Sequence, residues 1–238
     1  MLRRGLVVVL VLAAAGCSTP APSLPEPTPV PAEPCDVDML DAALANMADA
    51  DGYRFRRTLE HQELQRPTNL NNPVHVWVTE RSTGAYLAPD RGREEVVGGS
   101  PGGSLLGLDV AVSNGGRTWI YDRSVDTWYE WEVGMPANYA DAFNVAFGGQ
   151  PLAWEVVEDV EGLLGEGGCV LSTSAAGADA LILSVRIDPV AVRAYAWRIE
   201  QLPAAPDEGG GIRQAMEIEY VLPDPAEFRP PATFQAAP

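Results

Sequence analysis

The amino-acid sequence predicts an α+β domain: an antiparallel, strongly curved β-sheet, a half-barrel of about eleven strands, with two or more helices covering its concave face. The first observation is a series of segments, from residue 53 to residue 222, in which apolar and polar residues alternate and turn residues separate the segments. Strands joined by short turns pair antiparallel, and about eleven twisted strands tend to curl. The second observation is two amphipathic helical segments, which need an apolar surface to cover.

The first sixteen residues are typical of a bacterial export signal. Arg3 and Arg4 precede an apolar run, residues 5–15, which is shorter than the roughly 20 residues that cross a bilayer. The run ends in Ala14-Ala15-Gly16-Cys17, which resembles a lipobox, although Ala14 stands where Leu is usual. We therefore expect a lipoprotein signal peptide, residues 1–16, and a lipid anchor on Cys17. An ordinary secretory signal with a chance cysteine is the alternative.

Residues 18–34 predict a spacer between Cys17 and the folded part of the chain. Seven of these seventeen residues are proline, which excludes a packed helix or sheet. An extended chain of this length reaches about 50 Å at roughly 3.1 Å per residue. The expected division is therefore a signal peptide (1–16), a lipidated cysteine with a proline-rich tether (17–34) and a β-rich domain (35–238). The domain is expected outside the cytoplasm, anchored to the cell membrane or the outer membrane.

The domain begins with a predicted helix over residues 37–50. Asp36 is a candidate N-cap, and the apolar stripe consists of Leu40, Ala43, Leu44 and Met47. After Asp51-Gly52 the period changes to two. The predicted strands are residues 53–59, 74–79, 85–88, 94–97, 108–112, 117–121, 127–132, 153–160, 169–173, 181–188, 192–201 and 212–222. Asn114-Gly115-Gly116 predicts a tight hairpin turn.

A second amphipathic helix is predicted after Pro136. Tyr139, Phe143 and Phe147 follow one another at intervals of four residues and give it an aromatic stripe, which ends at Gly148-Gly149. The proline-rich tail from Pro223 onwards is expected to lie along an edge of the sheet.

Two cysteines remain once Cys17 is lipidated. Cys35 and Cys169 are then expected to form a disulfide, because the compartment is oxidising. Two reduced, buried cysteines are the alternative.

The charge of the chain excludes several functions. The formal net charge is −17, which argues against nucleic acid as a partner. All sixteen basic residues are arginine, so chemistry that needs a lysine, such as a phosphate-binding loop or a Schiff base, is impossible. No other segment is apolar enough to cross a membrane.

Three motifs suggest catalytic or metal sites but lack the necessary context. Ser100 lies in a G-x-S-x-G pattern, yet Pro101 and two glycines follow where a hydrolase needs a helix. His61 and His75 lack metal-ligand spacing. Asp122, Asp126 and Glu130 lack the glycine of a calcium loop and fit a solvated turn. We therefore expect no enzyme activity, metal or cofactor.

Four short segments resemble the LolA/LppX-like family of envelope lipoprotein and lipid carriers. They are residues 51–55 (Asp-Gly-Tyr-Arg-Phe), 88–91 (Ala-Pro-Asp-Arg), 117–122 with Trp128, and 185–189 (Val-Arg-Ile-Asp-Pro). The resemblance implies a helix-covered half-barrel that encloses an apolar cavity for acyl chains. It also covers envelope sensors that restrain a protein partner without carrying lipid.

The aromatic residues are the candidates for the lining of such a cavity, with filling of the core as the alternative reading. Trp119 and Tyr121 share one strand face, and Tyr195 and Trp197 are predicted to share another. The candidate lining is Phe55, Trp77, Leu87, Trp119, Tyr121, Trp128, Tyr139, Phe143, Phe147, Ile182, Tyr195 and Trp197. The leading hypothesis is an anchored carrier of a lipid or other amphiphile. The alternative is a protein-interaction or sensor module of the same fold with a closed core.

Overall fold

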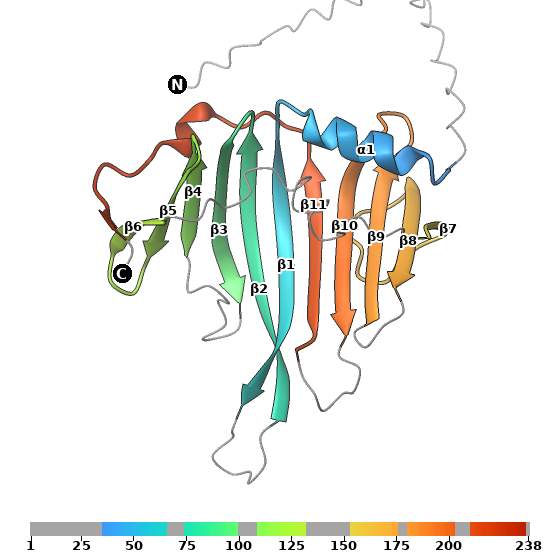
Figure 1. Cartoon of the computed structure of the whole chain (residues 1–238), viewed down its shortest axis with the longest axis horizontal. Coiled ribbons are helices and arrows are strands. Elements are labelled where there is room, and N and C mark those ends of the chain that lie inside the picture. The colour runs from blue at the N-terminus through green and yellow to red at the C-terminus, as the bar shows by residue number, and fades with distance from the viewer. Residues whose placement is uncertain are drawn as a thin grey trace, which may run out of the picture. The chain divides into compact units, whose positions relative to one another are not determined.

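The computed structural model describes residues 35–65, 74–99, 109–131, 153–175, 180–202 and 210–236. These residues form one twelve-stranded β-sheet with the α-helix α1 (Met39–Ala48) packed on one face (Figure 1). Cys17, the tether and the predicted second helix with Tyr139, Phe143 and Phe147 lie outside the described residues.

The strands closely follow the alternating segments of the sequence. They are β1 (Gly52–Gln65), β2 (Val74–Leu87), β3 (Arg91–Gly99), β4 (Val110–Asn114), β5 (Arg117–Asp122), β6 (Thr127–Trp131), β7 (Glu155–Val157), β8 (Cys169–Ala175), β9 (Ala180–Asp188), β10 (Arg193–Leu202), β11 (Ile212–Glu219) and β12 (Gln235–Ala236). A short 3-10 helix, η1 (Pro225–Phe228), precedes β12. The main correction is that two predicted strands, 74–79 and 85–88, are one continuous strand, β2.

The strand order shows two meanders that meet in the middle of the sheet. The order is β12-β6-β5-β4-β3-β2-β1-β11-β10-β9-β8-β7, so that β1 pairs with β11 (Figure 1). All neighbours pair antiparallel except β12, which pairs parallel to β6. The proline-rich tail thus lies along an edge of the sheet, as predicted.

The sheet is open and not strongly curled, which corrects the predicted half-barrel. β12 and β7 are the two edge strands of the sheet, and they do not pair with each other. A half-barrel gathers its apolar side chains on one concave face, whereas here apolar clusters cover parts of both faces. Neither face therefore has to wrap around a single core.

Helix α1 forms because four of its ten residues bury an apolar stripe against the sheet. Met39, Leu40, Ala43 and Met47 are buried, close to the predicted stripe. The N-cap is Asp38, not the predicted Asp36, and its side chain makes no capping hydrogen bond. We call the face of the sheet that α1 covers the helix face and the other one the opposite face.

The helix face carries the main core. Beneath α1 lie Tyr53 and Phe55 of β1, Leu171 of β8, Val185 of β9 and Trp197 of β10, all of them buried. Asn46 also donates a 2.8 Å hydrogen bond from Nδ2 to the carbonyl of Val192, between β9 and β10. The helix is therefore held mainly over the β8–β11 half of the sheet.

The structure confirms two local predictions, the tight hairpin turn at Asn114-Gly115-Gly116 and the Cys35–Cys169 disulfide. Gly115 and Gly116 both have positive φ, 62° and 76°, as a tight hairpin between β4 and β5 requires. Cys35 and Cys169 form a disulfide that closes a separation of 134 residues and ties the start of the domain to β8. No helix in the described part of the chain is long and apolar enough to span a membrane.

Candidate functional site

The predicted cavity residues that the structure describes lie on both faces of the sheet. Direct cross-strand partners share a face, and neighbours within a strand point to opposite faces. From Phe55 the register runs across β2, β3 and β4 to Ile120. Trp119 and Tyr121 flank Ile120 and therefore point to the opposite face, away from Phe55.

The same register places the other described candidates. Phe55 and Trp197 lie on the helix face, in the core under α1. On the opposite face lie Trp77, Leu87, Trp119, Tyr121, Trp128, Ile182 and Tyr195. The described candidates thus do not surround one space, and a cavity that includes Tyr139, Phe143 and Phe147 stays a prediction.

Tyr195 and Trp197 do not share a face, contrary to the prediction from alternation. The register between β9 and β10 shifts between Ala194 and Ala196, which marks a β-bulge at Tyr195. Trp197 is buried in the core under α1, whereas Tyr195 packs with Leu163 and Val170 on the opposite face. A bulge adds one residue to the strand and reverses the faces of the residues that follow it. The alternation of apolar and polar residues in one sequence does not reveal such a residue.

The opposite face is covered towards both ends of the sheet. On one side Phe228 of η1 is fully buried against Ala85 and Leu87 of β2. Further out, Phe234 packs edge-on against Trp119, with 6.2 Å between ring centroids. On the other side Leu163 packs with Val170 of β8 and with residues of β10. The C-terminal segment and residues 160–164 are thus two covers with the middle of the sheet between them.

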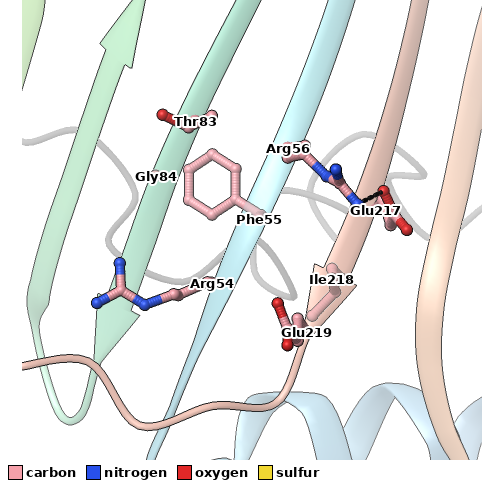
Figure 2. Close-up of a pocket in the computed structure, with 8 residues that line it drawn as sticks. All are labelled: Arg54, Phe55, Arg56, Thr83, Gly84, Glu217, Ile218 and Glu219. Atoms are coloured by element: carbon pink, nitrogen blue, oxygen red, sulfur yellow. Dashed lines mark ion pairs between the residues drawn. The ribbon is translucent and has the colours of Figure 1, made fainter. Parts of the chain in front are cut away.

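A hollow of about 510 Å³ lies on the sheet at β1, β2 and β11. Its lining comprises Arg54, Phe55, Arg56, Thr83, Gly84, Glu217, Ile218 and Glu219 (Figure 2). Four of these eight residues are charged, and by register they point to the opposite face. This composition differs from the largely apolar lining that a cavity for an acyl chain requires.

The charges of the hollow are mostly paired. Arg56 contacts Glu217 at 2.7 Å across β1 and β11, and its side chain remains 72% exposed. Arg54 donates two hydrogen bonds to Glu227 of η1, at 2.5 and 3.2 Å. This pairing lowers the pKa of the Glu227 carboxyl below its ordinary value. Glu219 is exposed, and no residue in the described part of the chain forms an ion pair with it.

Gly84 permits the close packing beneath the hollow. A Cβ at this position would overlap the ring of Phe55 and the carbonyl of Arg93, so a larger residue does not fit. Figure 2 shows the Phe55 ring extending from β1 over β2 at this glycine. An aromatic ring that covers a strand glycine helps to fix the register of the paired strands.

A buried ionic cluster on the helix face was not anticipated from the sequence. Arg57 contacts Glu94 at 2.5 Å and Glu80 at 3.2 Å, and its Nε donates to Ser82 at 3.1 Å. Ser82 also donates to Glu94 at 2.5 Å. These residues lie on β1, β2 and β3 at cross-strand positions. Their alternation with other polar residues resembles that of a solvated strand, so only the pairing register could have revealed the cluster.

The catalytic and metal motifs gain no support. The described residues contain no group of three or more His, Cys, Asp or Glu side chains that could hold a metal ion. His61 is buried and its Nε2 lies 3.0 Å from Glu63, while Asp122 accepts hydrogen bonds from Ser124 in a turn. Ser100 lies outside the described residues. The absence of enzyme activity stays a prediction.

Comparison with known proteins yields only weak similarities. No protein-family model matches the sequence, and no curated protein matches it. A chain of the Pseudomonas aeruginosa MucA/MucB complex aligns with 84% of this chain at 15% identity and a TM-score of 0.37. This chain spans 62% of the length of that chain. A β-barrel-like protein of a domain of unknown function, DUF1849, from Brucella abortus aligns with 71% of this chain and 96% of its own, at 9% identity and a TM-score of 0.21. Neither similarity carries an argument about function.

Proposed function

We propose that the domain is a protein-interaction module of the cell envelope, which binds a partner at the hollow on its opposite face without catalysing a reaction. The observation that carries the proposal is the composition of the hollow, where four of the eight lining residues are charged. Ionic and hydrogen-bonding side chains suit a polypeptide, and they disfavour an acyl chain, which cannot satisfy them.

The location in the envelope has separate support. A disulfide such as Cys35–Cys169 persists in oxidising compartments and is rare in the bacterial cytoplasm. In this proposal the signal peptide directs export, Cys17 carries the lipid anchor, and the tether of residues 18–34 holds the domain away from the membrane.

A second candidate is the lipid carrier implied by the resemblance to the LolA/LppX-like family. It is favoured by the apolar stripe of α1 lying over Phe55 and Trp197 on the helix face. A carrier would admit acyl chains between the helix and the sheet. The two functions therefore use different faces, and this difference separates them by experiment.

Site-specific photocrosslinking in intact cells of the source organism tests the main proposal. A photoreactive phenylalanine analogue replaces Thr83, which is exposed in the hollow, in the full chain. Val190, 73% exposed in the β9–β10 turn, is the control position. We expect a discrete protein adduct from position 83 and none from position 190. No protein adduct at position 83, or equal adducts at both, contradicts the proposal.

Native mass spectrometry of the full chain purified from the envelope tests the second candidate. A near-stoichiometric phospholipid beyond the covalent anchor would favour a carrier. A mass without bound lipid, together with no uptake from added phospholipid vesicles, would exclude that function.

A further inference from the structure

We propose that the hollow recognises a basic, extended segment of its partner and that Glu219 pairs with an arginine or lysine side chain of that segment. This inference rests on the proposed function and adds the chemistry of the partner to it.

The first argument is the balance of charge inside the hollow. Both of its arginines already have partners, Arg54 in Glu227 and Arg56 in Glu217. Glu219 is exposed on the adjacent strand, without an ion pair among the described residues. The charge available to a ligand is therefore negative, and the side chain that satisfies it is a cation.

The second argument is the charge of the whole chain. The net charge of −17 repels acidic partners and attracts basic ones during the encounter. The chain has no lysine, so its own cations are arginines only. The long-range field of the protein and the unpaired carboxylate thus both favour a positively charged partner.

The third argument is the shape of the surface that the described residues leave uncovered. The C-terminal segment covers β2 at Ala85 and Leu87, and residues 160–164 cover β8 and β10. Between these covers, the surface of the opposite face is formed by β1 and β11, together with the part of β2 that lines the hollow. We call this surface the floor. Three adjacent strands span roughly 10 Å, since neighbours lie about 4.8 Å apart. This width accommodates one extended segment.

The spacing of the charges on the floor matches such a segment. Glu217 and Glu219 are two residues apart on β11, as are Arg54 and Arg56 opposite them on β1. Residues two apart in a strand lie about 6.6 Å apart, the repeat of alternate side chains in any extended chain. A cation at one position of the partner would face Glu219, and the residue two positions along would face the pair of Arg56 and Glu217.

Fluorescence anisotropy with labelled peptides tests this inference on the full chain in non-ionic detergent. The probes are three ten-residue peptides that alternate alanine with arginine, glutamate or serine. We expect the arginine peptide to bind, the glutamate peptide not to bind, and added salt to weaken the binding. Preference for the glutamate or serine peptide, or no binding of the arginine peptide, overturns the inference.

A matched pair of variants locates the binding. Glu219→Gln removes the carboxylate in the hollow, and Glu155→Gln removes an exposed carboxylate on β7, four strands from β11. We expect Glu219→Gln to weaken binding of the arginine peptide about five-fold, the size of one good exposed ion pair, and Glu155→Gln to leave it unchanged. Equal effects would mean attraction to net charge alone and would overturn the site. Adducts at position 83 combined with either negative result would leave the proposed function standing while refuting the basic partner.

Discussion

Among the described residues, Arg57 is the only cation in the buried cluster with Glu80 and Glu94, and its side chain is 14% exposed. Without it, two carboxylates would remain buried on the helix face with no positive charge between them. Burying an unpaired charge costs more than the loss of a surface ion pair, because water no longer solvates it. The residue therefore contributes ionic contacts that join β1, β2 and β3 on the helix face.

We expect Arg57→Met to lower the free energy of unfolding by about 3–5 kcal/mol. Arg56→Met is the matched control. Arg56 is the preceding residue, it forms an ion pair with Glu217, and its side chain is 72% exposed. That variant should cost at most about 1 kcal/mol. Urea unfolding of both variants measures the difference. Equal costs would mean that the buried cluster contributes no more than a surface pair.

At the scale of elements, the sequence predicted strands best where alternation was apolar against polar. The helix at 37–50, the hairpin at Asn114-Gly115-Gly116 and most strand positions agree with the structure to within a few residues. The alternation divides β2 because the polar residues Glu80 and Ser82 interrupt its apolar pattern, whereas in the structure both are buried and contact Arg57. The bulge at Tyr195 and the charged hollow depend on pairing between distant strands, which one sequence does not display.

The disulfide joins the residues before α1 to β8, so it fixes the helix end to the sheet. The chain-entropy estimate for a loop of this length is about 5 kcal/mol, and measured values are often smaller. We expect Cys35→Ser with Cys169→Ser to lower the free energy of unfolding by about 2–5 kcal/mol. Unfolding of the wild type with and without reductant is the companion measurement. An unchanged midpoint in both experiments would show that the disulfide does not stabilise the fold.

Glu227 of η1 has a lowered pKa, mainly because its carboxyl accepts hydrogen bonds from Arg54, while burial raises the pKa in part. A carboxyl with a lowered pKa in the folded state stabilises the fold above its ordinary pKa of 4.5, and this contribution is lost as pH falls through the folded value. We therefore expect the melting temperature of Glu227→Gln to fall less steeply below pH 4.5 than that of the wild type. Parallel curves for the two proteins would show that the pair does not contribute.

For the whole molecule, the decisive contact is the pairing of β1 with β11, which joins two otherwise separate meanders. β1 is fourteen residues long, and without β11 its outer edge would be unpaired. Long unpaired edges promote association between chains.

We expect a chain that ends at Leu202, and so lacks β11, to aggregate after refolding. A chain that ends at Arg229 is the control, because it keeps β11 and Phe228 and loses only the two-residue strand β12 with its flanks. Size-exclusion chromatography distinguishes monomer from aggregate. If the chain that ends at Leu202 is monomeric, β1 does not need β11 to prevent aggregation.

The same pairing sets the moment at which the hollow comes into existence. β1 is the first of the described strands to leave the ribosome and β11 is among the last, so their side chains meet only after the intervening chain has been made. Arg56 and Glu217 therefore cannot form their ion pair in an incomplete nascent polypeptide. A partner that recognises this surface would distinguish finished molecules from unfinished ones, without any separate signal of maturity.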